Sequence, residues 1–206
     1  MTISNTASGL RPGICTSTTR PSAPYEGQMI YETDTDMVAL WNGSAWRYIA
    51  ATTPTNGTVL QVQSTHCNTQ TTSTSASFVD ISGMSVSITP RSSSSKMLVQ
   101  VKMSIGHFNA DDIAFNLLRN GSDIAQGTGG STRNSTLFGR GESSSNYFQY
   151  NCFIYGVDFL DSPATTSALT YKMQWYTRVG TITLNRRGGD GALSGTSSIT
   201  VMEIAA

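Results

Sequence analysis

Charged side chains are scarce in this sequence, and neither sign dominates. They make up 13% of the 206 residues, with 13 basic residues against 13 acidic ones. Only Lys96, Lys102 and Lys172 are lysines. Nucleic-acid binding draws much of its affinity from basic side chains that neutralise phosphates, and anionic membranes attract polybasic clusters. We therefore expect neither a nucleic-acid partner nor a polybasic membrane anchor.

Long apolar runs are also missing. None approaches the roughly 18 residues that a membrane-spanning helix requires. The first residues, MTISNTASGLRPG, contain neither the basic stretch nor the apolar stretch of a secretory leader. The sequence therefore predicts a soluble protein made in the cytoplasm, with no membrane insertion.

Residues that commonly hold metals or act as nucleophile and base are few. The chain has three cysteines at no metal-like spacing and only two histidines, His66 and His107. Asp34 and Asp36 lie close together, but a calcium loop brings about six or more oxygen ligands. No serine lies in a G-x-S-x-G elbow, and no glycine cluster precedes a helical pattern as a phosphate loop must. We therefore predict no catalytic residues, no metal site and no cofactor, and hence no enzyme.

Serine, threonine and glycine are abundant instead. Serine and threonine form about a quarter of the chain, and glycine adds 19 residues. This composition favours strands and turns over helices. Alternation is clearest at residues 97 to 105, where the odd positions are all apolar: Met97, Val99, Val101, Met103 and Ile105. The sequence therefore predicts an all-β protein.

Residues 58–206 contain repeated strand-length runs and no sustained apolar period of 3.6 residues. Eight to ten strands in about 150 residues are typical of an antiparallel sandwich. We expect a jelly-roll-like β-sandwich head domain with strands at 58–63, 78–81, 84–88, 96–108, 113–119, 124–126, 147–160, 169–178, 181–185 and 198–204.

Three shorter segments precede this domain. Residues 1–20 show no apolar period and are interpreted as a docking arm that becomes ordered only against something else. Residues 21–50 predict a small β-meander, because an Asp turn and an Asn-Gly turn separate three strand-like runs. Residues 51–57, ATTPTNG, are interpreted as a linker.

Several aromatic residues are predicted to serve packing or assembly. Trp41 and Trp46 flank the Asn-Gly turn and should form a cross-strand pair. The run from Tyr147 to Leu160 carries apolar groups on both faces, which predicts cover on both sides, with a neighbouring subunit as the simplest second cover. The remaining candidates for assembly or packing are Tyr147, Tyr150, Phe153, Tyr155 and Trp175.

Two parts of the chain resemble known proteins. The stretch TTRPSAPYEGQMIYETDTD, residues 18–36, continuing to WNGSAW at 41–46, resembles a module of tailed-bacteriophage virion proteins, particularly fibre-like proteins of cyanophages and other marine phages. The later runs FVDI, SITP, SKMLV and SITVMEI are similar to the β-sandwich heads of those proteins. The resemblance implies a virion structural protein, usually a trimer, located in the particle and assembled in the host cytoplasm.

The resemblance leaves three functions open. The first is a short trimeric fibre or spike, docked to other virion proteins of tail or capsid by its N-terminal region, whose head attaches to the host. The linker of about seven residues leaves no room for the extended shaft of a long fibre. The second is a capsid decoration or cement protein that stabilises the shell. The third is a glycan-binding or glycan-degrading tail protein.

Polar loops supply the candidate contact residues for a host glycan or a neighbouring protein. The loop at 107–112 offers an imidazole and carboxylates, and the loops at 127–145 and 186–195 offer arginines, the side chains that pair best with anionic groups. An ordinary solvated loop is the competing interpretation for each. The candidates are His107, Asn109, Asp111, Asp112, Arg133, Arg140, Arg186 and Arg187.

Overall fold

The computed structural model describes residues 12–49, 54–130, 133–139 and 148–206. The chain forms two compact units, divided between Pro54 and Thr55. Both units are built from β-strands, and the only helical element among the described residues is one 3₁₀ turn, η1, at Phe148–Tyr150. In this described part, no helix is long and apolar enough to span a membrane. The predicted all-β class is confirmed.

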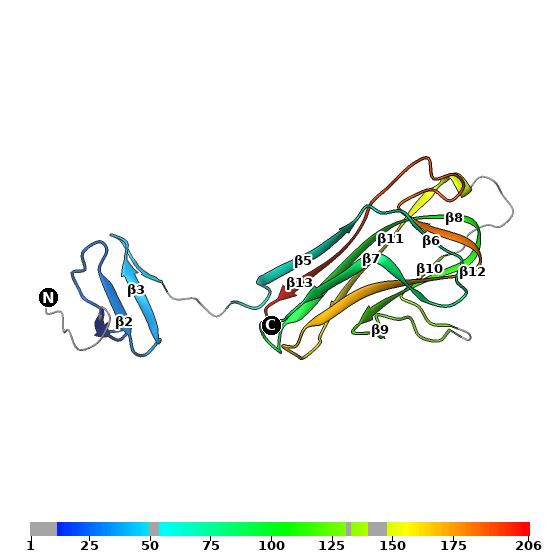
Figure 1. Cartoon of the computed structure of the whole chain (residues 1–206). Helices are drawn as coiled ribbons and strands as arrows, with labels where there is room; N and C mark the ends of the chain where they lie inside the picture. Colours follow the sequence, from blue (N-terminus) through cyan, green and yellow to red (C-terminus); the bar gives the residue numbers. More distant parts are fainter. Residues whose placement is uncertain (1–11, 50–53, 131–132, 140–147) are drawn as a thin grey trace. The chain divides into compact units, whose positions relative to one another are not determined.

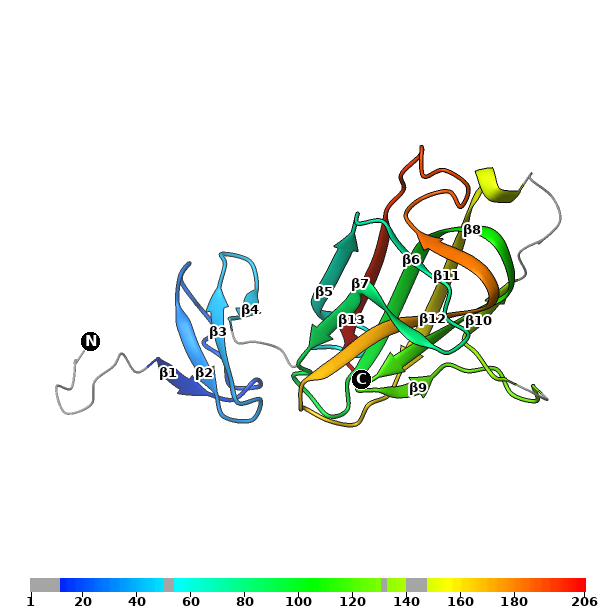
Figure 2. The same ribbon diagram turned by 45° about the vertical axis from the view of Figure 1, so that its right-hand side comes forward.

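The smaller unit is a four-stranded sheet in the order β1-β2-β3-β4 (Figure 2). The three antiparallel strands match the predicted meander: β2 at Met29–Glu32, β3 at Met37–Trp41 and β4 at Trp46–Tyr48. Gly43 has a φ of 91°, so the Asn-Gly turn uses the backbone freedom that only glycine offers readily. The Trp41 and Trp46 rings lie 5.6 Å apart, which confirms the predicted cross-strand pair.

The fourth strand of this unit comes from the range interpreted as an arm. β1, at Gly13–Cys15, pairs in parallel with β2. A hydrogen bond from Thr33 N to Cys15 O continues this pairing. Residues 13–15 are therefore ordered by the chain's own meander. The sequence did not predict this strand because the segment has no apolar period.

The larger unit is a nine-stranded sheet that curls over itself (Figure 1). Among the described residues, every strand pair in it is antiparallel. Its strands are β5 at Val59–Cys67, β6 at Thr71–Ser73, β7 at Val79–Ile88, β8 at Lys96–Arg119, β9 at Ser122–Ile124, β10 at Leu137–Gly139, β11 at Cys152–Asp161, β12 at Leu169–Leu184 and β13 at Ser197–Ile204.

The 24-residue strand β8 joins two layers of this sandwich. Its first half pairs with β13 on one side and β11 on the other. Its second half pairs with β12 on one side and with β10 and β9 on the other. We call β5, β13, the first half of β8 and β11 the first layer. The second layer consists of β7, β12, the second half of β8, β9 and β10, and the short strand β6 pairs with the last residues of β12.

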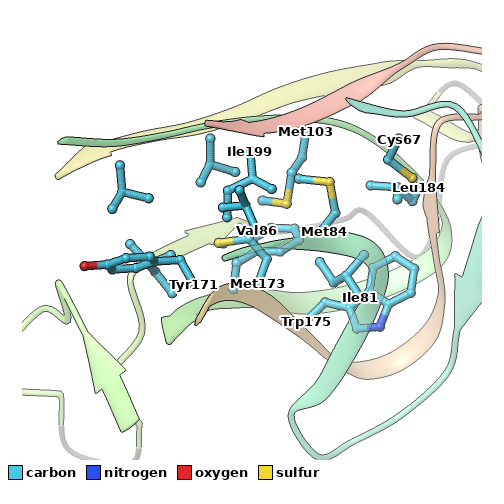
Figure 3. Close-up of a cluster of buried hydrophobic side chains, with 14 of the residues drawn as sticks. Cys67, Ile81, Met84, Val86, Met103, Tyr171, Met173, Trp175, Leu184 and Ile199 are labelled. Carbon is cyan, nitrogen blue, oxygen red and sulfur yellow. The ribbon is translucent and has the colours of Figure 1, made fainter. Parts of the chain in front are cut away.

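The hydrophobic core fills the space between these layers (Figure 3). The first layer contributes the alternating apolar residues of β8, all at most 5% exposed, which confirms the predicted alternation. Met84 and Val86 of β7 and Tyr171, Met173 and Trp175 of β12 face them from the second layer. Trp175 is thus a core residue of one subunit.

The expected loop at 107–112 is instead a continuous part of β8. Asn109 and Asp112 take positive φ values of 49° and 47°, and Gly180 on β12 takes a φ of 77°. The register between β12 and β8 shifts at Val179/Thr181. The polar residues of this stretch are therefore accommodated by a bulge, and the pairing continues past them.

Candidate functional site

The structure separates most of the predicted contact residues. His107 is buried in β8 and its ring stacks on Phe153 at 5.3 Å, so it does not offer an imidazole at a loop surface. Burial lowers the pKa of His107. Asn109 is exposed at the bulge but does not line the pocket described below. Arg140 and Tyr147 lie outside the described residues.

The Arg186-Arg187 pair lies in the loop before β13, and its two side chains differ. Arg187 forms an ion pair with Asp190 and lies over the ring of Tyr150, with its guanidinium carbon 5.2 Å from the ring centre. Arg186 is half-buried beside Gly188. Neither is close enough to Arg133 to line the same pocket.

Two of the predicted residues, Asp112 and Arg133, do come together at a pocket of about 490 Å³. It lies on the outer face of the second layer. In register, Phe138 of β10 and Tyr176 of β12 both pair with Ala114 of β8, so the three form one row across the sheet. Because Ala114 is small, it leaves a hollow between the two aromatic residues.

Arg133 forms one wall of this pocket. Its guanidinium carbon lies 3.6 Å from the centre of the Tyr176 ring and 5.7 Å from that of Phe78. Stacking of this kind holds the guanidinium plane while leaving its N–H edges available. Among the described residues, no carboxylate forms an ion pair with Arg133.

Arg178 and Asp112 also line the pocket, and Asp111 pairs with the same arginine. Arg178 Nε lies 2.8 Å from Asp112 Oδ2, and the same guanidinium pairs with Asp111. Consecutive residues of a regular strand point to opposite faces, so the positive φ of Asp112 lets both carboxylates reach one arginine. Asp111, and Asp112 less strongly, raise the pKa of Arg178.

The sequence analysis missed Phe138, Ala114 and Arg178 as members of this site. These residues come together only through the register that aligns β10, β8 and β12. This register is difficult to predict from the sequence, because a strand as short as β10 has no recognisable alternation. Tyr176 faces the pocket, whereas Tyr171 and Trp175 of the same strand lie in the core.

No metal site is found in the part of the chain that the structure describes, where no three histidine, cysteine or acidic side chains gather. Asp34 accepts hydrogen bonds from the backbone and side chain of Ser17, and Asp36 accepts one from Tyr31. These two carboxylates therefore hold the turn of the smaller unit.

The outer face of the first layer carries a second distinctive surface. Pairing aligns Val62 with Met202, Met202 with Leu98, and Leu98 with Leu160. We call these four residues, which cross β5, β13, β8 and β11, the apolar row. Val62 is 50% exposed and Leu160 is 56% exposed, while the two between them are half-buried. The next row along the strands is polar, with Ser64 bonded to Thr200 and Gln100 to Asp158.

The strand β11 borders this surface and has the predicted two-sided apolar character. Its inner residues, including Tyr155 and Phe159, are only partly buried against the core. Its outer residues Ile154 and Leu160 are 60% and 56% exposed. Within the described ranges, β11 pairs with β8 alone, so no described strand lies along its second edge.

Comparisons with known proteins give structural likenesses only. No protein-family model matches the chain, and no curated protein matches it by sequence. The PRD1 vertex protein P5 is similar at 10% identity and a TM-score of 0.41, over 73% of this chain and 100% of that chain. A chain of infectious bursal disease virus, Gx strain, is similar at 11% identity and a TM-score of 0.34, over 81% of this chain and 42% of that chain.

A VP2 subviral particle of infectious bursal disease virus matches at 11% identity and a TM-score of 0.32, over 91% of this chain and 46% of that chain. This chain thus spans less than half the length of either infectious bursal disease virus chain. Because these TM-scores lie below 0.5, we base the functional proposal on the chain's own residues and surfaces.

Proposed function

We propose that this chain is a non-enzymatic virion structural protein. In this proposal, a short trimeric fibre or spike docks to other virion proteins through its N-terminal region and displays the larger unit for host attachment. It is assembled in the host cytoplasm and acts in the particle. The resemblance of residues 18–46 to phage virion modules supplies the context, and the apolar row is the observation that carries the assembly role.

The apolar row is suited to contact with further copies of the chain. Neighbouring strands lie about 4.8 Å apart, so four residues on four strands make a stripe about 14 Å wide. Fully burying a side chain of this size stabilises by roughly 1.5–3 kcal/mol relative to exposure. Contiguous apolar surface rimmed by polar residues is typical of protein interfaces. The second edge of β11, where no described strand pairs, adds backbone groups that such an interface can satisfy.

Sedimentation of the purified full chain tests the assembly role. Leu160→Lys places a charge at the end of the apolar row without touching the core, and we expect it to convert a trimer into monomers. Leu193→Lys is the matched control, because Leu193 is 64% exposed but lies in the loop before β13, away from the row. A wild-type chain that sediments as a monomer, or a Leu160→Lys chain that remains trimeric, contradicts this use of the row.

Capsid decoration is the main competing role, because an apolar surface can also bind neighbouring shell proteins. Measuring the adsorption of particles to host cells distinguishes decoration from host attachment. Particles that lack the protein should lose adsorption if it attaches to the host, whereas intact adsorption with a weakened shell would establish decoration. Release of sugars from host glycans by the purified chain would overturn the non-enzymatic proposal.

A further inference from the structure

We propose that the pocket above Ala114 binds a carboxylated pyranose, the acidic sugar unit found in uronate polymers and in sialylated glycans. This inference rests on the proposed display role, for which it names a ligand class. The pocket comprises Ala114, Phe138, Tyr176, Arg133, Arg178 and Asp112. Its volume of about 490 Å³ falls within the usual range of small-molecule sites, roughly 300–1,000 Å³.

The pocket offers a wall on which one face of a sugar ring can stack. Ala114 is only 7% exposed and forms the floor, because its row neighbours on both sides are larger aromatic residues. Phe138 is 82% exposed, so nearly all of its ring is available to solvent. An aromatic face has a negative quadrupole and attracts the weakly positive C–H groups on the apolar face of a sugar. Such a ring beside a hollow offers a stacking wall.

The charge pattern selects an acidic sugar over a neutral one. Arg178 is matched by Asp111 and Asp112. Arg133 is held against Tyr176 and has no ion pair with a carboxylate of the described residues. A planar guanidinium with available N–H edges matches a carboxylate, which it can bind with two parallel hydrogen bonds. The sugar carboxylate would therefore supply a counter-charge that none of the described carboxylates gives to Arg133.

The remaining polar groups suit hydroxyls. The exposed carboxylate of Asp112 can accept hydrogen bonds from sugar O–H groups, and Ser135 also lines the pocket. The bulge between β8 and β12 places the side chains of Asp112 and Arg178 at the pocket. The same carboxylate argues against a dianionic phosphate ligand, because like charges would meet at the pocket.

Calorimetric or NMR titration of the purified full chain with small glycosides tests the proposal. Methyl β-glucuronide and methyl β-glucoside are a matched pair that differ only in the C6 carboxylate, and a methyl sialoside represents the second source. We expect at least one acidic glycoside to bind tenfold or more tightly than the glucoside. Equal binding of acidic and neutral glycosides, or no binding of any of them at millimolar concentrations, would overturn the proposal.

Variants assign the binding to this pocket. Arg133→Gln should reduce acidic-sugar affinity at least tenfold and remove the preference for the acidic sugar over the glucoside, whereas Ala114→Leu should fill the hollow and weaken the binding of both sugars. Phe138→Ala should weaken both as well, and its exposed position keeps the fold intact. Arg187→Gln is the control, because Arg187 also stacks on an aromatic ring but already has Asp190 as its partner. Unchanged discrimination in Arg133→Gln would contradict the proposal.

These titrations are independent of sedimentation and of particle incorporation. A chain that assembles into trimers but binds no acidic sugar would refute the ligand and leave the assembly role standing. A chain that binds the sugar but sediments as a monomer would refute the assembly role and leave the pocket standing.

Discussion

In each of the two units, an arginine and a tyrosine both donate hydrogen bonds to one buried carboxylate. In the smaller unit, Glu32 is 0% exposed and accepts hydrogen bonds from Arg20 Nε at 2.5 Å and from the Tyr48 hydroxyl at 3.0 Å. In the larger unit, Asp161 accepts hydrogen bonds from Arg119 at 2.7 Å and from the Tyr171 hydroxyl at 2.7 Å. Both sites combine an arginine with a tyrosine, so the burial of charge is compensated by directed hydrogen bonds.

Glu32→Gln should destabilise the smaller unit by about 2 kcal/mol, because the hydrogen bonds lose their charge. Arg20 lowers the pKa of Glu32 below its ordinary value of 4.5. The stabilisation from the charged form is therefore complete above about pH 4.5, and it is lost as the pH falls through the lowered pKa. The variant should lack this pH dependence.

The measurement is denaturant unfolding followed by tryptophan fluorescence. The chain has three tryptophans, and a Trp175→Phe background leaves only Trp41 and Trp46, which report on the smaller unit. Two results would contradict this stabilising role of Glu32. The first is an unfolding midpoint at pH 7 that is the same in Glu32→Gln and its parent. The second is a midpoint that shifts equally with pH in both proteins.

At the scale of elements, the bulge between β8 and β12 decides where the pocket lies. Gly180 sits at the register shift with a φ of 77°, and a Cβ there would collide with the backbone oxygen of Asn109. Gly121, in the Asn-Gly turn after β8, has a φ of 86° and open space around the Cβ position. The two glycines share a backbone conformation but differ in how closely another strand approaches.

Gly180→Ala should therefore destabilise the larger unit by more than Gly121→Ala. Positive φ costs an L residue about 1–2 kcal/mol in either variant, and the close approach adds the cost of separating β8 from β12 only at Gly180. Thermal unfolding of the full chain measures the difference. Equal losses in the two variants would mean that the bulge tolerates a methyl group.

Sequence patterns predicted some elements well because the relevant physics is local. The alternation from Met97 to Ile105 and the Asn-Gly turns at Asn42 and Asn120 depend on neighbouring residues, and the structure agrees with them. The bulge at Asn109 and Asp112 depends on its partner strand, so the polar run there looked like a loop. The pocket was missed for the same reason, because three strands must be aligned before Phe138, Ala114 and Tyr176 form a row.

At the scale of the whole molecule, the larger unit separates its two candidate surfaces. The apolar row lies on the outer face of the first layer, and the pocket above Ala114 lies on the outer face of the second. The core lies between them. In the proposed assembly, subunits that cover the apolar row would leave the pocket open, so the two proposed roles would not compete for the same residues.

Deletion of residues 1–11 tests the proposed docking of the chain to the particle. The deletion leaves β1 and Arg20 in place, so the hydrogen bonds to Glu32 are retained. We expect the trimer to form normally but to be lost from purified particles, as measured by its copy number per particle. Incorporation at the wild-type level would show that this segment is not required for docking.

The place of β13 in the sheet has a consequence for biosynthesis. β13 lies between β5 and β8, so the first layer is closed by the strand that the ribosome delivers after the other strands of this sheet. A nascent chain that stops before Ser197 has no Met202 with which to bridge Val62 and Leu98. Prematurely terminated chains would thus never display a finished apolar row, so under the proposed assembly role they would be excluded from the oligomer.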